Sequence, residues 1–270
     1  MEQFTPEIFT SVINSYLPEP HASLLNGMLF GINLKTSNAF YEQLKVVGLL
    51  HIVVLSGMNI TLVGSILINV FSFISKRKAA LITILIIILF IIFVGAQAPI
   101  IRAGFMGILT LVAFLYGRKS LVLFALFLSA VFIFIFWPEW IKTISLQLSY
   151  AATLGIILFG QTREIKTESQ IERFVHTVKK DIRISLAAQV FTAPIIFLYF
   201  KQVSVISPVS NLFVSFLIGP LTLLGFVTAF FGKIHYSLGL LPSYLCYGLL
   251  SYMIFVIETL SKMPFVYFKF

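Results

Sequence analysis

Charged residues and cysteine are scarce in this sequence. Charged residues make up 11% of the chain and hydrophobic residues 59%, and there is one cysteine, Cys246. A soluble domain carries about 25% charged residues, so the composition argues for an integral membrane protein. The mean hydropathy of +1.02 agrees with this interpretation. The single cysteine excludes an internal disulfide and a metal site built from cysteines.

The sequence also lacks the common motifs of enzymes. It has no phosphate-binding loop, no His/Cys/Asp cluster at metal-ligand spacing and no carboxylate pair for acid–base catalysis. Ser56 and His51 lie five residues apart, about 140° around a helix, so they cannot meet as nucleophile and base on one straight helix. We therefore expect no catalytic activity, no metal and no cofactor. Whatever the chain moves must be driven by a gradient or by a partner.

Apolar runs long enough to cross a bilayer fill most of the chain. We expect an all-α fold, a polytopic integral membrane helix bundle of about eight transmembrane helices, some of them broken or kinked. Prolines predict helix breaks at Pro99, Pro194 and Pro208, because proline lacks the amide donor. The seventh span is expected to be one kinked helix or a broken pair. The expected spans are 48–73, 79–97, 99–116, 121–136, 143–160, 184–200, 205–231 and 240–261.

Residues 1–47 differ from the rest and are predicted to form an interfacial or amphipathic N-terminal segment. Its apolar stretch 22–32 is too short to span, so it either lies at the membrane interface or packs on the bundle. Residues 48–270 are predicted to form the transmembrane core, with a basic loop at 161–183. For that loop an amphipathic surface helix and a solvated linker both remain open.

Basic residues between the expected spans are unequally divided between the two sides of the membrane. Six lie on one side: Lys35, Lys45, Lys142, Lys201, Lys262 and Lys269. Twelve lie on the other: Lys76, Arg77, Lys78, Arg118, Lys119, Arg163, Lys166, Arg173, Lys179, Lys180, Arg183 and Lys233. The richer side is predicted to be cytoplasmic. We therefore expect a multi-pass protein of the cytoplasmic (inner) membrane with both termini outside.

Polar residues inside the apolar runs are the candidates for a functional site, because such residues are costly in hydrocarbon. They are His51, Ser56, Gly57, Asn59, Arg102, Gln147, Ser149, Gln189 and Asn211. Gly57 is expected to bend or unwind the first span and to let backbone groups line a polar cavity. The opposing interpretation is that the polar residues only hold helices together through hydrogen bonds.

Arg102 is the one lysine or arginine that lies within an expected span. If it lies near the outer end of its helix, its side chain reaches the headgroups. The alternative is a phosphate contact inside a pore, since a guanidinium pairs with phosphate through two parallel hydrogen bonds. Glu258 is the visible acidic partner within the spans, and this shortage of acids favours an anionic ligand or carbonyl groups over a buried ion pair.

In order along the chain, several segments resemble the signature elements of the ComEC-type competence protein family. The resemblance covers roughly residues 22–235. Its elements are Gly27–Gly31, His51–Gly57, Pro99–Ala103, Trp137–Pro138, Leu146–Ala151, Ala188–Pro194 and Ser207–Asn211. Asn59 departs from the pattern, because the family often has a second histidine there. A role that needs titration is therefore not expected at this position, whereas a hydrogen-bonding role survives.

The resemblance implies a channel that passes single-stranded DNA across the cytoplasmic membrane during natural transformation. On this interpretation Arg102 contacts phosphate. The constriction is shaped by His51, Ser56, Gly57 and Asn59, and the path is lined by Gln147, Ser149, Gln189 and Asn211. The implied partners are single-stranded DNA and the lipid bilayer. Full-length members add an OB-like domain and often a nuclease domain, so a DNA receptor, a nuclease and a cytoplasmic motor or DNA-binding protein are expected on other chains.

Two other classes of protein remain open. A secondary transporter of a small anionic or lipid-like solute would use the same polar interior and broken helices. A structural membrane subunit would use the polar residues for packing alone, and replacing Arg102 by alanine would then lower stability without a separate transport defect. A pore wide enough for a nucleotide chain distinguishes the DNA channel from the small-solute transporter.

Overall fold

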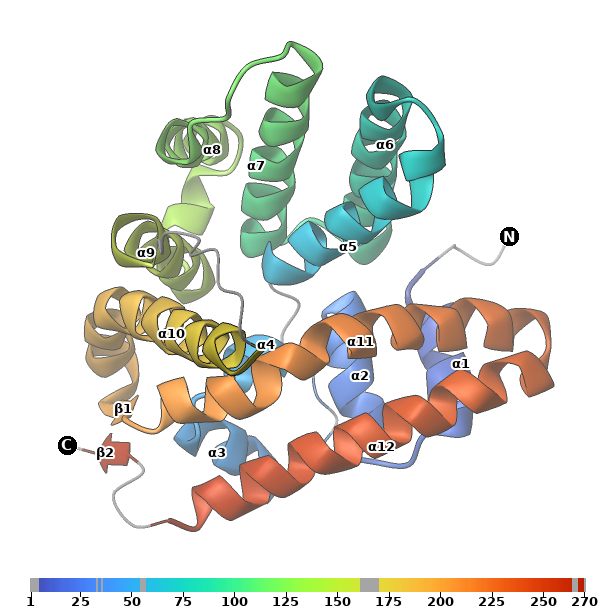
Figure 1. Cartoon of the computed structure of the whole chain (residues 1–270). Helices are drawn as coiled ribbons and strands as arrows, with labels where there is room; N and C mark the ends of the chain where they lie inside the picture. The colour runs from blue at the N-terminus through green and yellow to red at the C-terminus, as the bar shows by residue number, and fades with distance from the viewer. Residues whose placement is uncertain are drawn as a thin grey trace.

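The chain is almost entirely helical (Figure 1). The computed structural model describes residues 5–32, 34, 36–53, 57–160, 170–263 and 267–269. Within these residues the helices are α1 to α12, with two short 3-10 turns, η1 and η2, and two three-residue strands, β1 and β2.

Four short helices open the chain and form much of its core. They are α1 (Glu7–Tyr16), α2 (His21–Phe30), α3 (Asn38–Val46) and α4 (Leu50–Val53). Every residue of α2 from Ala22 to Phe30 is buried, and α2 ends where Gly31 adopts φ +69°, a conformation that glycine tolerates. Of the two placements left open for this stretch, packing on the bundle is the one observed.

A second group of helices packs around α7. It comprises α5 (Gly57–Val70), η1 (Phe71–Phe73), α6 (Lys76–Val94), α7 (Ala98–Leu115), α8 (Val122–Phe136) and η2 (Pro138–Lys142). Gly95 has φ +97° and separates α6 from α7. Buried Ile60, Ile87, Ile100 and Ala103 fill the space where α5, α6 and α7 meet.

The last four helices form two packed pairs. They are α9 (Ile144–Phe159), α10 (Gln170–Phe200), α11 (Ser207–Ile234) and α12 (Tyr236–Ser261). Helix α9 packs along α10, and α11 packs along α12. Between α10 and α11, β1 (Gln202–Ser204) pairs antiparallel with β2 (Tyr267–Lys269).

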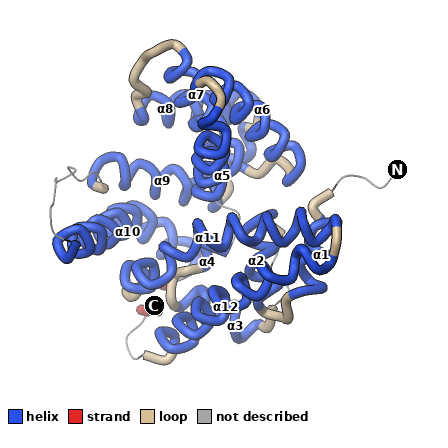
Figure 2. Tube along the Cα trace, turned by 45° about the vertical axis from the view of Figure 1, so that its right-hand side comes forward, coloured by secondary structure: helices blue, strands red, loops and turns tan. Residues whose placement is uncertain are grey.

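The helices form three groups that both views separate (Figure 1, Figure 2). Helices α5 to α8 lie in the upper part, α1 to α4 lie below with α11 and α12, and α9 and α10 lie at one side. In Figure 1, α6 and α7 stand upright whereas α11 and α12 run across the view. The long helices therefore do not share one axis.

The helix lengths and surfaces confirm an all-α membrane bundle. Five helices, α6, α7, α10, α11 and α12, are long and apolar enough to span a bilayer, and apolar helices of 10–17 residues occupy 60–70, 122–136 and 144–159. These eight segments match the eight expected spans. Large apolar side chains are exposed along them, for example Ile92 at 71% and Phe127 at 62%. Such surfaces suit contact with lipid rather than water.

The structure decides two expectations about α10. Residues 170–183, for which a surface helix and a solvated linker both remained open, are helical and form the first turns of α10, because no glycine or proline interrupts the chain before Pro194. Pro194 itself lies inside α10, so the predicted break there is wrong. A transmembrane helix can continue through proline when neighbouring groups satisfy the freed carbonyl.

The prolines of the other two predicted breaks lie at helix starts. Pro99 and Pro208 occupy the first turns of α7 and α11, where the missing amide hydrogen costs nothing. The seventh span is one helix, α11, which also contains Pro220. Residues 161–169 of the predicted basic loop lie outside the described residues.

Candidate functional site

Arg102 is buried inside the bundle near the start of α7. The helix begins at Ala98, Pro99 occupies its first turn, and Arg102 follows within the same turn. Only 7% of the Arg102 side chain and backbone surface is exposed. The guanidinium therefore does not reach into open solvent, and the contacts that replace its water decide what the site can bind.

Three groups surround the guanidinium of Arg102. Its Nε donates to Oγ of Ser149 on α9 over 2.9 Å, and Nη1 donates to the sulfur of Met106 over 3.5 Å. The ring of Tyr150 lies 5.7 Å from the guanidinium carbon, within cation–π range. A hydroxyl, a thioether and an aromatic face carry no formal charge, so they leave the positive charge of Arg102 uncompensated.

Tyr150 is itself held in place by α8. Its hydroxyl lies 2.8 Å from Oγ of buried Ser129, and that Oγ donates to the carbonyl of Leu126. Since a serine hydroxyl has one hydrogen, the Tyr150 hydroxyl is the donor to Ser129. The chain of contacts Arg102–Tyr150–Ser129 thus links α7, α9 and α8.

Gly57, the first residue of α5, closes the site from another direction. A methyl group at Gly57 would lie 2.8 Å from Nη2 of Arg102 and 2.8 Å from Cβ of Ala103. Glycine is therefore required for α5 to approach α7 so closely. Three predicted site residues, Gly57, Arg102 and Ser149, are brought together here from separate helices.

No carboxylate in the described part of the chain pairs with Arg102. The ion pair recorded there joins Lys45 and Glu42, and Glu258, the acidic partner considered from the sequence, is exposed on α12. A guanidinium has five N–H groups, and contacts with described residues use two. The site can therefore offer hydrogen bonds and positive charge to an anion.

Gln189 and Asn211 belong to a second polar cluster, between α10 and α11. Asn211 donates to Oγ of Ser185 over 2.7 Å, and Gln189, one turn further along α10, donates to the carbonyl of Ser204 over 2.6 Å. Three buried oxygens of this cluster have no hydrogen-bond partner among the described residues: Gln189 Oε1, Ser204 Oγ and Asn211 Oδ1. Buried acceptors of this kind are usually satisfied by water, so the cluster is suited to hold hydration.

Gly48 and His51 lie beside this second cluster. Gly48 has φ +75°, and a methyl group there would come within 2.6 Å of Cβ of Ser207. The carbonyl of Gly48 is 2.9 Å from Nδ1 of His51, whose side chain is exposed. Gly48 thus packs against Ser207 and Ser204 of this cluster, and His51 is held to the carbonyl of Gly48.

The remaining predicted residues lie elsewhere. Gln147, near the start of α9, accepts from the hydroxyl of Tyr199 over 3.2 Å and donates to the carbonyl of Ile141. Ser56 and the side chain of Asn59 lie outside the described residues. Of the described predicted residues, Gly57, Arg102 and Ser149 lie in one site and Gln189 and Asn211 in the other, whereas Gln147 and His51 have separate contacts.

Sequence reasoning missed Tyr150 and Ser129 as parts of the Arg102 site. Tyr150 directly follows Ser149, and Ser129 is the one hydroxyl residue in the apolar helix α8. The feature of the sequence that indicates Ser129 is its position as a lone hydroxyl residue in an apolar run, because a serine in hydrocarbon needs a hydrogen-bond partner.

Comparison with known proteins identifies the family. The sequence pattern of the family described as Competence protein matches residues 28–270. The chain belongs to the Competence protein family. Its predicted resemblance to competence proteins is thereby confirmed, and family membership supports a role in competence, the uptake of DNA by cells.

A curated relative in the same family is ComE operon protein 3 of Bacillus subtilis (strain 168). It is 26% identical over 238 residues, which are 84% of this chain and 30% of the relative. The chain thus corresponds to about a third of that relative's length. No solved structure matches the chain. The Competence family match covers α3 to α12, and with them the whole of the Arg102 site and of the Gln189–Asn211 cluster.

Proposed function

We propose that this chain forms a passage for single-stranded DNA across the cytoplasmic membrane during DNA uptake, with Arg102 as a phosphate contact. The observation that carries the proposal is the buried guanidinium of Arg102, which has no carboxylate partner among the described residues. An unpaired buried cation is costly, and a passing phosphate would supply the missing negative charge.

The chemistry of the site fits a phosphodiester backbone. Arginine binds phosphate through paired N–H groups, and such charge-assisted hydrogen bonds are about twice as strong as neutral ones. Neutral partners at Ser149, Tyr150 and Met106 hold the guanidinium without neutralising it. A single contact of this kind reads no sequence, which suits a passage for any strand.

Passage requires the site to open. Arg102 is 7% exposed, and Gly57 lies against Arg102 and Ala103. In the proposal, α5 separates from α7 at this contact and admits a phosphate. The second cluster, with its three unpartnered oxygens, would then provide a hydrated segment of the same path.

The proposal assigns no catalytic step to this chain. A DNA receptor, a nuclease and a cytoplasmic motor or DNA-binding protein would act from other chains. Localisation in the cytoplasmic membrane with both termini outside is part of the proposal, and it rests on the distribution of basic residues.

The test is uptake of labelled DNA into a naturally transformable host, scored as label protected from external DNase. A deletion strain is compared with strains restored by the wild-type chain and by Arg102→Ala at matched membrane abundance. We expect Arg102→Ala to lower uptake about tenfold or more, the effect of losing one charge-assisted contact. Lys262→Ala, which removes one exposed cation at the end of α12, serves as the matched control and should restore uptake fully.

Two results would contradict the proposal. Normal uptake in the deletion strain would exclude the proposed DNA passage. It would favour a transporter of small anionic or lipid-like solutes, which the same site could serve. Normal uptake with Arg102→Ala at matched abundance would show that Arg102 is not a phosphate contact, and a need for higher expression to reach that abundance would assign it a structural role alone.

A further inference from the structure

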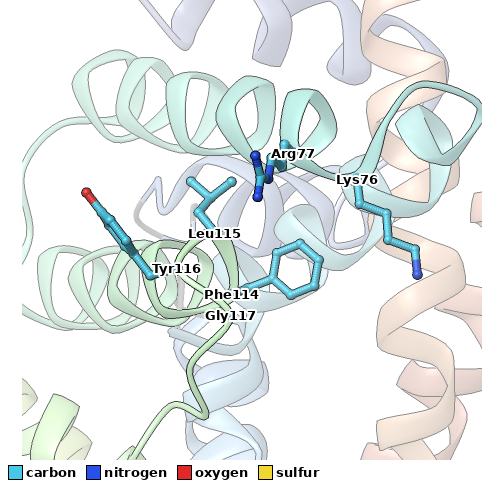
Figure 3. Close-up of a pocket in the computed structure, with 6 residues that line it drawn as sticks. All are labelled: Lys76, Arg77, Phe114, Leu115, Tyr116 and Gly117. Carbon is cyan, nitrogen blue, oxygen red and sulfur yellow. The ribbon is translucent and has the colours of Figure 1, made fainter.

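A basic pocket lies where α6 begins and α7 ends (Figure 3). Its volume is about 490 Å³, and it is lined by Lys76, Arg77, Phe114, Leu115, Tyr116 and Gly117. Figure 3 shows the Arg77 guanidinium facing Leu115 and Phe114, with Tyr116 on one side and Lys76 on the other. The pocket therefore combines positive charge with an apolar floor.

No negative charge in the surrounding sequence offsets this pocket. Between Glu42 and Glu139 the chain contains no aspartate or glutamate. Lys76, Arg77, Lys78, Arg118 and Lys119 are all exposed, and none forms an ion pair with a described residue. The start of α6 adds the partial positive charge of its free amide groups. An anion is the natural complement of this surface.

The length of α6 sets the depth of the pocket in a bilayer. Its 19 residues extend about 28 Å at 1.5 Å per residue, close to the thickness of the hydrocarbon core. When α6 spans, Lys76 and Arg77 therefore lie at the level of the lipid phosphates. Tyr116, which is 79% exposed, is typical of the aromatic residues found at that level.

Arg77 also stands at the head of an exposed apolar stripe on α6. Leu81, Leu85, Ile88 and Ile92 follow it at helical spacing, and each is at least 40% exposed. Residues three or four apart share one face of a helix, so the stripe continues directly from Arg77. A cation followed by an exposed apolar stripe matches a phospholipid, which has an anionic headgroup above apolar chains.

We propose that this pocket binds an anionic phospholipid, with Arg77 and Lys76 contacting the headgroup phosphate and an acyl chain lying along the exposed face of α6. The bias of basic residues toward one side of a membrane explains which side these residues occupy. It does not explain a pocket with an apolar floor whose arginine continues into an apolar stripe. This inference is independent of the proposed DNA passage.

The test is a lipid titration of the purified full chain in detergent, followed by native mass spectrometry. The probes are dioleoylphosphatidylglycerol, dioleoylphosphatidylcholine and glycerol phosphate. We expect phosphatidylglycerol to bind more tightly than phosphatidylcholine, and glycerol phosphate to bind weakly because it lacks acyl chains. Arg77→Gln and Lys76→Gln should each weaken phosphatidylglycerol binding about fivefold, the usual effect of one basic residue near an anionic surface.

Lys142→Gln is the matched control, because it removes one exposed cation at the far end of α8. It should leave phosphatidylglycerol binding unchanged. The inference is overturned if Arg77→Gln has no effect, or if it weakens binding of both lipids equally, since the pocket would then not recognise the phosphate charge. Binding of glycerol phosphate as tight as that of phosphatidylglycerol would also overturn it, because the pocket would then be a site for a free phosphate ester.

Discussion

At Arg102, a hydroxyl, a thioether and an aromatic ring take the place of the carboxylate that usually accompanies a buried arginine. Each of these groups stabilises the cation weakly. The arrangement keeps the guanidinium positioned and leaves its charge available. In a structural ion pair, by contrast, the charge is already neutralised.

Gly57→Ala is predicted to disturb this site by steric conflict. The new methyl group would lie 2.8 Å from Cβ of Ala103 and 2.8 Å from Nη2 of Arg102, closer than packed carbon atoms approach. Overpacking of this kind costs about 1–3 kcal/mol. We expect a lower midpoint of thermal unfolding for the purified protein in detergent.

Gly107→Ala provides the matched control for Gly57→Ala. Gly107 lies in α7, and a methyl group there would have no neighbour within 4 Å. Alanine favours a helix over glycine by about 1 kcal/mol, so this variant should unfold at an equal or higher temperature. If both variants behave alike, α5 does not depend on the close contact at Gly57.

The sequence identified several members of the site but not how they meet. Arg102, Ser149 and Gly57 were singled out because polar residues and glycine are conspicuous in apolar runs. Their proximity could not be predicted, since Arg102 and Ser149 lie 47 residues apart and nothing local fixes how α7 and α9 pack. His51 illustrates the same limit, because its described hydrogen bond is to the carbonyl of Gly48, which the sequence did not single out.

At the level of helices, the pairing of α9 with α10 depends on Gly155. A methyl group at Gly155 would contact the carbonyl oxygen of Ala187 and lie 2.9 Å from the ring of Phe191. A backbone carbonyl cannot move aside as a flexible side chain can. We expect Gly155→Ala to separate the two helices and to lower the free energy of unfolding by about 1–3 kcal/mol, measured as a fall in the thermal midpoint in detergent.

Gly248→Ala in α12 is the control for Gly155→Ala, because a methyl group there meets no atom within 4 Å. It should be neutral or slightly stabilising. An unchanged midpoint for Gly155→Ala would show that the α9–α10 pair can shift without cost, contrary to the close packing seen here.

Spans were predictable from hydropathy, whereas helix boundaries and crossings were not. All eight expected spans correspond to apolar helices because the apolar runs themselves determine them. The sequence left a helix and a linker both open for residues 170–183, because charged residues indicate exposure without opposing helix formation, and it did not predict that this helix continues into the span. The helix break predicted at Pro194 does not occur, since one missing hydrogen bond within a long helix is only a local defect.

For the whole molecule, the packing of α6 against α11 bears on the topology that charge predicts. The distribution of basic residues predicts that Lys76, at the start of α6, faces the cytoplasm and that the other end of α6 lies on the outer side. Yet the ring of Phe90 of α6 lies 5.9 Å from that of Phe226 of α11, in the half of α11 that leads to the end predicted to lie inside. In two upright helices Phe90 and Phe226 would lie about 10 Å apart in depth, since they lie four and eight residues before the ends of their helices and the rise is 1.5 Å per residue. The steep crossing of α6 and α11 in Figure 1 accounts for the contact if α11 traverses the bilayer at an incline.

Cysteine accessibility tests this arrangement directly, with Lys233→Cys at the end of α11 as the decisive position. We expect a membrane-impermeant maleimide to label Lys142→Cys and Lys262→Cys in intact cells, and to label Lys119→Cys and Lys233→Cys only after permeabilisation, because the basic-rich side faces the cytoplasm. Native Cys246 is fully buried, so it contributes little background.

Labelling of Lys119→Cys and Lys233→Cys from opposite sides would show that α11 does not cross in the direction predicted by charge. Labelling of Lys119→Cys in intact cells would reverse the orientation of α6 to α8 and place the basic pocket on the outer surface.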